Sequence, residues 1–197
     1  MARKSPSPTP KTKSAGREAK VLRHTRETQI ELRLALDGAG AFRGSSGLPF
    51  LDHMLTLLAR HAGWDLALEA GGDLPVDCHH MVEDLGIVLG QALREAAGSK
   101  AGIQRYGQAA IPMEETLVNA ALDFCGRPYL HWGIPLLDRE LIGDYATEMT
   151  EDFFRAVAMN SGLTVHFDLV RGRNAHHIIE AAFKAFARAM RQALSAD

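Results

Sequence analysis

The sequence predicts an α+β fold made by internal duplication, in which two similar halves each form a small, mainly antiparallel sheet with helices packed on one face. The stretch HHMVEDLGIVLGQALREAAG from His79 aligns without a gap on HHIIEAAFKAFARAMRQALS from His176. Each copy follows a segment with the pattern of helix, glycine and strand, and each half begins with a stretch that resembles a strand. We therefore expect one half at residues 21–105 and the other at 106–197, together forming one compact unit.

Residues 1–20 differ from the rest of the chain. They contain prolines at positions 6, 8 and 10 and six basic residues against one acid, with few apolar side chains. Such a composition cannot bury a core, so we expect a disordered basic tail. An organelle-targeting or RNA-binding tail is the alternative, but basic termini are more often solvated extensions, and we assign this tail no function.

The start of each half has strand character. Apolar residues at 30, 32, 34 and 36 alternate with Gln29, Glu31, Arg33 and Ala35, and the turn-forming stretch DGAG follows. Strict alternation predicts a half-buried strand. Residues 115–123, followed by a glycine, show a weaker version of this pattern.

The helices of each half show periodic apolar positions and glycine stop signals. Gly63 and Gly162 lie where a helix C-cap is expected, each followed by a predicted strand. In this alignment His53 corresponds to Asp152. The two aligned stretches that begin at His79 and His176 are predicted helices because apolar residues recur at three- and four-residue spacing.

Composition excludes several classes of function. The chain has 197 residues, 46% hydrophobic and 23% charged, with a formal net charge of −2. It therefore has no general attraction to nucleic acid or to an anionic membrane. No apolar run approaches the roughly 18 residues of a membrane span, and the N-terminus lacks a secretory apolar core. We expect a cytoplasmic protein with neither nucleic-acid nor membrane partners.

A HHxxE motif occurs twice, as His79, His80 and Glu83 and as His176, His177 and Glu180. On a helix the first histidine and the glutamate share a face, whereas the second histidine lies about 100° around the axis. One helix can hardly close all three ligands around one ion, so we expect two ions, each shared between helices. Imidazole and carboxylate without thiolate suit Mn, Fe, Zn, Co or Ni, and an open six-coordinate site favours Mn or Fe. A single His-His pair usually marks only a helix terminus or a surface feature, but two equivalent copies favour metal binding.

Five segments carry a family resemblance: PFLDHMLTLLARH, DCHHMVEDLGIVLGQAL, GIQRYGQAAIPMEETL, LDFCGRPYL and GRNAHHIIEAAFKAFARAMRQAL. From about Arg23 to the C-terminal helix, the chain resembles imidazoleglycerol-phosphate dehydratase of histidine biosynthesis. The resemblance implies a lyase that removes water from D-erythro-imidazole glycerol phosphate to give imidazole acetol phosphate. It also implies two Mn²⁺ ions per active site and a homo-oligomer of 24 subunits with active sites between subunits.

The resemblance also implies roles for individual residues. The positions that match metal ligands are His53, His79, His80, Glu83, His176, His177 and Glu180, and the repeat adds Asp152. Glu27 matches the acid/base glutamate, and Glu180 is the second carboxylate predicted to act in catalysis. Without the resemblance, Glu27 would be an exposed strand carboxylate and Asp152 an ordinary acid in the first turn of a helix.

Three basic residues match positions that bind the substrate phosphate: Arg105, Arg127 and Lys184. Lys184 follows Glu180 by four residues and therefore shares its helix face. Its counterpart in the first half is Ile87, so only the second half keeps a cation there. Arg105 and Arg127 are otherwise ordinary surface arginines.

The sequence departs from the family pattern at three positions. The family often has Gln at Leu57, usually Asp at Glu114 and often His at Asp152. Loss of Gln affects substrate contacts, and the longer Glu114 shifts a hydrogen bond beside the metal ligands. A metal-storage assembly on the same scaffold is the alternative function, but it gives no reason for Glu27 or the three cations. A hydrolase that uses metal-activated water is a weaker third choice.

Overall fold

The computed structural model describes residues 16–135 and 140–197. The first half contains β1 (Glu18–His24), β2 (Thr28–Ala35), β3 (Phe42–Ser45), α1 (Pro49–Ala62), β4 (Asp65–Gly72) and α2 (His79–Ala97). Its sheet has the order β1-β2-β4-β3, antiparallel except for the β3–β4 pair.

The second half repeats this arrangement with β5 (Tyr106–Met113), β6 (Thr116–Asp123), β7 (Tyr129–Gly133), α3 (Met149–Ser161), β10 (Thr164–Arg171) and α4 (Ala175–Ala193). The sheet order is β5-β6-β10-β7, again with one parallel pair, β7–β10. A hairpin of β8 (Leu141–Ile142) and β9 (Tyr145–Ala146) precedes α3. The predicted α+β class and the duplication are thus confirmed.

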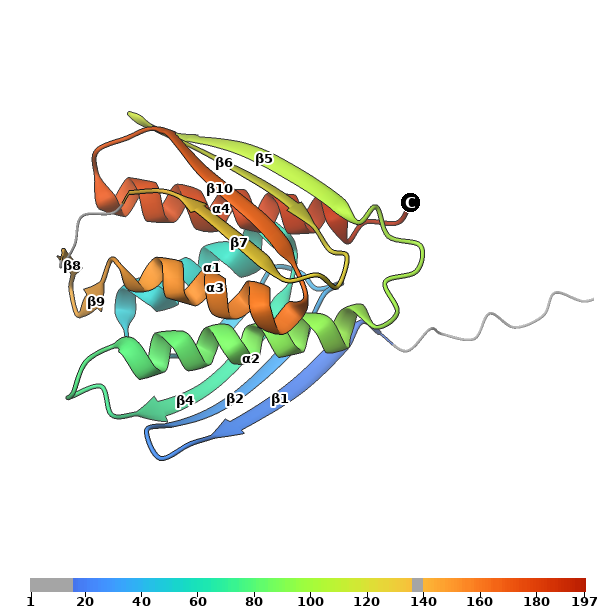
Figure 1. Ribbon diagram of the computed structural model, residues 1–197. Helices are drawn as coiled ribbons and strands as arrows, with labels where there is room; N and C mark the ends of the chain where they lie inside the picture. The colour runs from blue at the N-terminus through green and yellow to red at the C-terminus, as the bar shows by residue number, and fades with distance from the viewer. Residues whose placement is uncertain (1–15, 136–139) are drawn as a thin grey trace, which may run out of the picture.

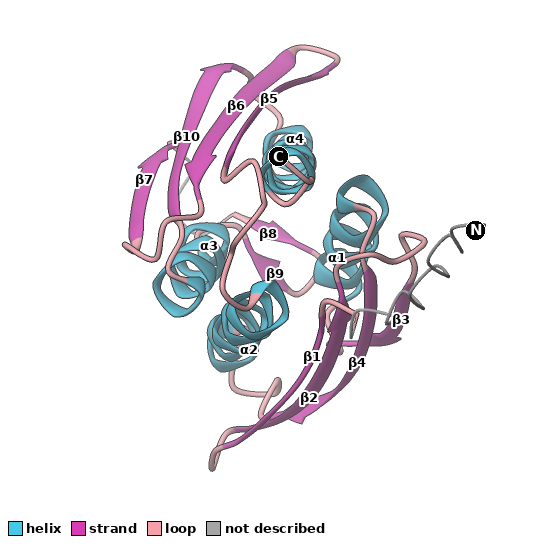
Figure 2. Ribbon diagram, turned by 90° about the vertical axis from the view of Figure 1, so that its right-hand side faces the viewer, coloured by secondary structure: helices cyan, strands magenta, loops and turns pink. Residues whose placement is uncertain are grey.

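The helices form the middle of the molecule. Figures 1 and 2 show the four helices lying between the two sheets, so each sheet is covered on one face. The helices pack across the halves, α2 against α3 and α1 against α4. Buried residues of both halves, among them Leu85 and Phe153, belong to one apolar cluster. The two halves therefore share one hydrophobic core. Neither the alternation of apolar residues nor the sequence repeat shows directly that the core is shared.

Local sequence explains the element boundaries. Ile30, Leu32 and Leu34 are buried on the helix side of β2, as their alternation predicts. The helices α1 and α3 both end at a glycine with φ of 77°, Gly63 and Gly162, a left-handed conformation that favours glycine.

The predicted tail lies mostly outside the described residues, which begin at 16. Residues 18–20, which the composition assigned to the tail, form the start of β1. Arg17 also donates to the Leu194 carbonyl and pairs with Asp37. In the described part of the chain, no helix is long and apolar enough to cross a membrane.

Candidate active site

Two histidines and a glutamate from different halves form a cluster at the start of α1 and α4. The Nε2 atoms of His53 and His176 lie 3.3 and 3.2 Å from Oε2 of Glu180. One potential ligand atom from each residue lies within 4.8 Å of the others. The Glu180 side chain is 8% exposed, whereas both histidines are about half exposed, at 49% and 43%. A buried carboxylate under two accessible imidazoles is a donor set that fits a divalent metal ion such as Mn²⁺.

The second oxygen of Glu180 is held by a cation. Lys184 Nζ lies 2.6 Å from Glu180 Oε1, one helical turn further along α4. Burial opposes ionisation of Glu180, but the hydrogen bond and charge of Lys184 outweigh it and keep the pKa of the carboxyl below its usual value. Glu180 is therefore an anion before any metal binds.

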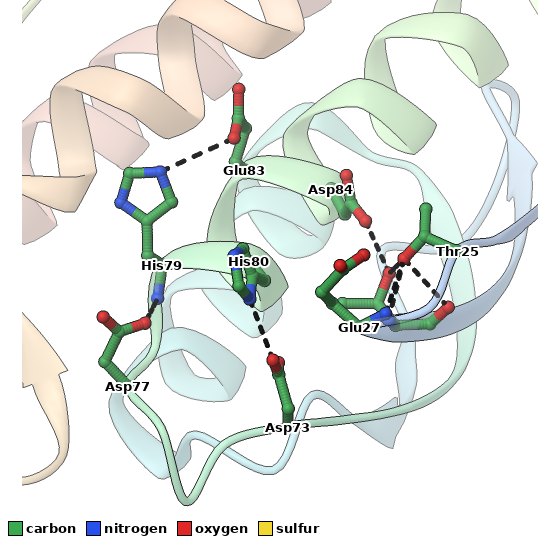
Figure 3. A network of polar contacts seen from close by, with 9 residues as sticks. Thr25, Glu27, Asp73, Asp77, His79, His80, Glu83 and Asp84 are labelled. Atoms are coloured by element: carbon green, nitrogen blue, oxygen red, sulfur yellow. Dashed lines mark hydrogen bonds and ion pairs between the residues drawn. The ribbon is translucent and has the colours of Figure 1, made fainter.

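The first HHxxE motif offers a more open pair. His79 Nε2 lies 3.6 Å from Glu83 Oε2, and both side chains are half exposed (Figure 3). Asp152 lies in the first turn of α3. This helix packs closely on α2, because a Cβ added to Gly86 of α2 would lie 2.7 Å from the Phe153 carbonyl oxygen of α3. Among the described residues, however, Asp152 belongs to neither of the two groups placed to share an ion.

The second histidine of each motif has a carboxylate partner that the sequence analysis did not identify. His80 Nδ1 donates to Asp73 Oδ2 at 2.9 Å (Figure 3), and His177 Nδ1 donates to Glu115 Oε2 at 2.8 Å. These hydrogen bonds raise the pKa of both histidines, and His177 lowers the pKa of Glu115 to about 2. The Glu-Thr pair that occurs at residues 27–28 and again at 115–116 is a sequence signal that could have identified Glu115.

Glu27 lies in the turn between β1 and β2. Its backbone N–H donates to Thr25 Oγ1 at 3.1 Å, and the next residue, Thr28, donates its hydroxyl to the buried Asp84. Asp84 in turn lies 2.8 Å from Arg23 Nε. This network anchors the turn, while the exposed Glu27 carboxylate has no hydrogen-bond or ion-pair partner among the described residues (Figure 3).

Comparison with known proteins identifies the family of this chain. The family model described as imidazoleglycerol-phosphate dehydratase matches residues 46–190, which include both HHxxE motifs. The chain belongs to the imidazoleglycerol-phosphate dehydratase family. It is therefore an enzyme of the hydro-lyase class.

Individual members of this dehydratase family align with nearly the whole chain. The imidazoleglycerol-phosphate dehydratase of Moorella thermoacetica is 56% identical over 92% of both chains, and that of Geobacter metallireducens is 52% identical over the same shares. The crystal structure of imidazoleglycerol-phosphate dehydratase from Staphylococcus aureus superposes with a TM-score of 0.82 and 43% identity, covering 91% of this chain and 99% of that one.

In this member of the dehydratase family, two predicted phosphate ligands lie far from His176 in the cluster of potential metal ligands. Arg105 binds Asp123 through Nε at 2.6 Å and through a terminal nitrogen at 2.9 Å, and Arg127 lies 3.9 Å from the same carboxylate. The Arg105 backbone N–H donates to Ala193, at the end of α4 opposite to His176. At 1.5 Å per residue, the two ends of α4 are roughly 25 Å apart. One chain therefore does not bring these arginines to the His176 end of α4.

The departures from the family pattern have structural settings. Leu57 is partly buried against the core, one turn after His53. Glu114 lies in the β5–β6 turn with a φ of 50°, and its carboxylate is close enough to Glu115 and His177 to form the second group of potential metal ligands.

Proposed function

We propose that this chain is a metal-dependent imidazoleglycerol-phosphate dehydratase, which removes water from D-erythro-imidazole glycerol phosphate to give imidazole acetol phosphate in cytoplasmic histidine biosynthesis. The observation that carries this proposal is the cluster of His53, His176 and Glu180, formed by two halves of a chain in this family. The cluster accounts for the second HHxxE motif together with His53, because residues of both take part in it.

The residues present suit two Mn²⁺ ions. His53, His176 and Glu180 would hold one ion, and His79 and Glu83, with Asp152, would hold the other. When bound, the ions supply Lewis acidity at the ring nitrogens of the substrate imidazole, which makes its neighbouring C–H bond acidic enough to break. Imidazole and carboxylate ligands without thiolate support Mn²⁺ over softer metals.

The remaining residues perform the proton and phosphate chemistry. The free, exposed carboxylate of Glu27 is available to move a proton, and its turn is anchored by Asp84. Lys184 and the two arginines bind the phosphate through charge-assisted hydrogen bonds. A metal-storage assembly would need neither an unpaired carboxylate nor these cations.

We propose that each active site takes residues from more than one subunit. The Nδ1 atoms of His80 and His177 each donate to a carboxylate of the same chain, which leaves both Nε2 lone pairs available for a metal ion. We propose that these Nε2 atoms bind ions of active sites that include a neighbouring subunit. Arg105 and Arg127 lie at the far end of α4 and need a second copy to reach the phosphate. These features support a homo-oligomer, and the resemblance suggests 24 subunits.

The test is a dehydration assay on purified full-length protein after chelation and after return of Mn²⁺ or Mg²⁺. We expect chelation to abolish product formation and Mn²⁺ to restore it better than Mg²⁺, which accepts imidazole poorly. Full activity of the metal-free protein would refute metal dependence. A protein that binds Mn²⁺ stoichiometrically but forms no product would favour storage.

A further inference from the structure

The two halves orient their second histidine with carboxylates from different positions. Glu27 and Glu115 occupy equivalent places, each immediately before a buried threonine that opens the second strand of its sheet. Gly72 and Gly172 are also equivalent, because a Cβ on either glycine would contact that threonine. The residue after this glycine is Asp73 in one half and Arg173 in the other.

In the second half, Glu115 is fully engaged. Its Oε2 accepts from His177 Nδ1 at 2.8 Å. Its Oε1 accepts from the backbone N–H groups of Asn174 at 3.0 Å and Arg173 at 3.4 Å. The position equivalent to Asp73 is Arg173, which has no carboxylate. Of the two positions compared, only Glu115 can therefore accept the hydrogen bond from His177.

In the first half, the same task falls to a different residue. Asp73 follows Gly72 and accepts from His80 Nδ1 at 2.9 Å (Figure 3). Glu27, the equivalent of Glu115, therefore keeps a carboxylate without a partner among the described residues.

A carboxylate on Nδ1 has a definite effect on a ligand histidine. It holds the proton on Nδ1, fixes the orientation of the ring and leaves the lone pair of Nε2 for a metal ion. Both second histidines carry this arrangement, although their carboxylates come from different loops.

We propose that Asp73 and Glu115 are positioning residues that orient His80 and His177 for metal binding, and that Asp73, by taking over this task, leaves Glu27 free for proton transfer. This inference rests on the proposed function, because it assigns the two histidines to metal ions. It also accounts for the fact that only one of two equivalent glutamates is available as an acid or base.

The first test compares Mn²⁺ affinity, by calorimetry, in Asp73→Ala, Asp73→Asn, Glu115→Ala and Glu115→Gln. We expect the alanine variants to lose about 10- to 100-fold in affinity, the range for loss of such a partner. The amide variants keep an acceptor oxygen and should recover part of that loss. The matched control is Asp168→Ala. This variant removes an exposed carboxylate of β10, which lies 3.5 Å from His131, and should not change the affinity.

The second test is a double-mutant cycle between Asp73→Ala and Glu27→Ala, read out as Mn²⁺ affinity. In Asp73→Ala, Glu27 can bind His80 as Glu115 binds His177, so part of the affinity should remain. Glu27→Ala alone should leave the affinity unchanged, and the double variant should lose more binding free energy than the sum of the single losses.

The outcomes separate the two proposals. If the parent protein binds Mn²⁺ and dehydrates its substrate but Asp73→Ala and Glu115→Ala bind Mn²⁺ as tightly as the parent, the positioning role is refuted. Additive effects in the cycle would refute the link between Asp73 and Glu27. A parent protein that shows no metal-dependent activity would instead refute the proposed function.

Discussion

Lys184 Nζ lies 2.6 Å from Oε1 of Glu180, while Oε2 of the same carboxylate faces His53 and His176. A predicted phosphate ligand and a predicted metal ligand are therefore in direct contact. Under the proposed function, this contact joins the phosphate-binding position to the metal-binding position through one buried carboxylate, so changes at Lys184 should affect both.

We expect Lys184→Ala to raise KM and also to tighten Mn²⁺ binding. The phosphate contact is made in the ground state and the transition state alike, so its loss acts mainly on KM. The metal effect follows because Glu180 loses a neighbouring cation that occupies one carboxylate oxygen and repels Mn²⁺. Steady-state kinetics and calorimetric titration with Mn²⁺ measure the two effects. Arg188→Ala, one turn further along α4 and exposed, is the control, and an unchanged KM in Lys184→Ala would contradict the assignment.

Glu27→Gln should lower kcat by about 10² or more, because general acid–base catalysis typically contributes 10²- to 10⁴-fold. Substrate and Mn²⁺ should still bind, since the carboxylate lies outside both groups of potential metal ligands found among the described residues. Glu69→Gln, at an exposed position of β4, is the matched control. Near-normal turnover of Glu27→Gln would return Glu27 to the role of a surface carboxylate.

Active sites shared between subunits should allow complementation. At low substrate concentration, Arg105→Ala and His176→Ala are each expected to be nearly inactive, because one removes a phosphate ligand and raises KM and the other removes a metal ligand. When the two variants are unfolded, mixed and refolded together, some sites should combine an intact arginine with an intact cluster and regain activity. Each variant refolded alone is the control. If the mixture stays as inactive as the separate variants, both residues act within one subunit.

Asp152→Ala should lower the Mn²⁺ content per subunit, whereas Asp152→His should retain metal and activity. The repeat aligns Asp152 with His53, and a carboxylate or imidazole at this position suits Mn²⁺. Elemental analysis after dialysis measures the content. Glu151→Ala, which removes the neighbouring acid that pairs with Arg155, is the control. Equal Mn²⁺ in Asp152→Ala and the parent would make Asp152 a helix-start residue.

Gly90→Ala should destabilise the fold by about 1–3 kcal/mol, the usual cost of overpacking a core. A Cβ at Gly90 would lie 2.7 Å from the Val157 carbonyl oxygen, a backbone atom of α3 that cannot rotate away. This cost exceeds the gain of up to about 1 kcal/mol that alanine brings to a helix. Denaturant unfolding provides the measurement. Gly71→Ala, where a new Cβ meets nothing within 4 Å, should behave as the parent protein.

Much of the fold could be predicted because its signals are local. The alternation in β2, the glycine caps of α1 and α3 and the two aligned helices follow from side chains within a few residues of one another. The same holds for the HHxxE motifs, whose spacing alone puts a histidine and a glutamate on one helix face. The hydrogen bonds of Asp73 and Glu115 to the two histidines were missed because each carboxylate lies in a loop and meets its histidine only in the folded chain.

The sequence by itself determined the duplication, the α+β class, the family and the residue types available for metal and phosphate. Only the tertiary structure decided which residues meet. His53 and Glu180 are 127 positions apart, and they are neighbours because α1 packs on α4 of the other half. The tertiary structure also places Arg105 beside Ala193, at the end of α4 opposite to His176. Periodicity records which face of an element is apolar, whereas the partner of that face depends on how the two halves close on one another.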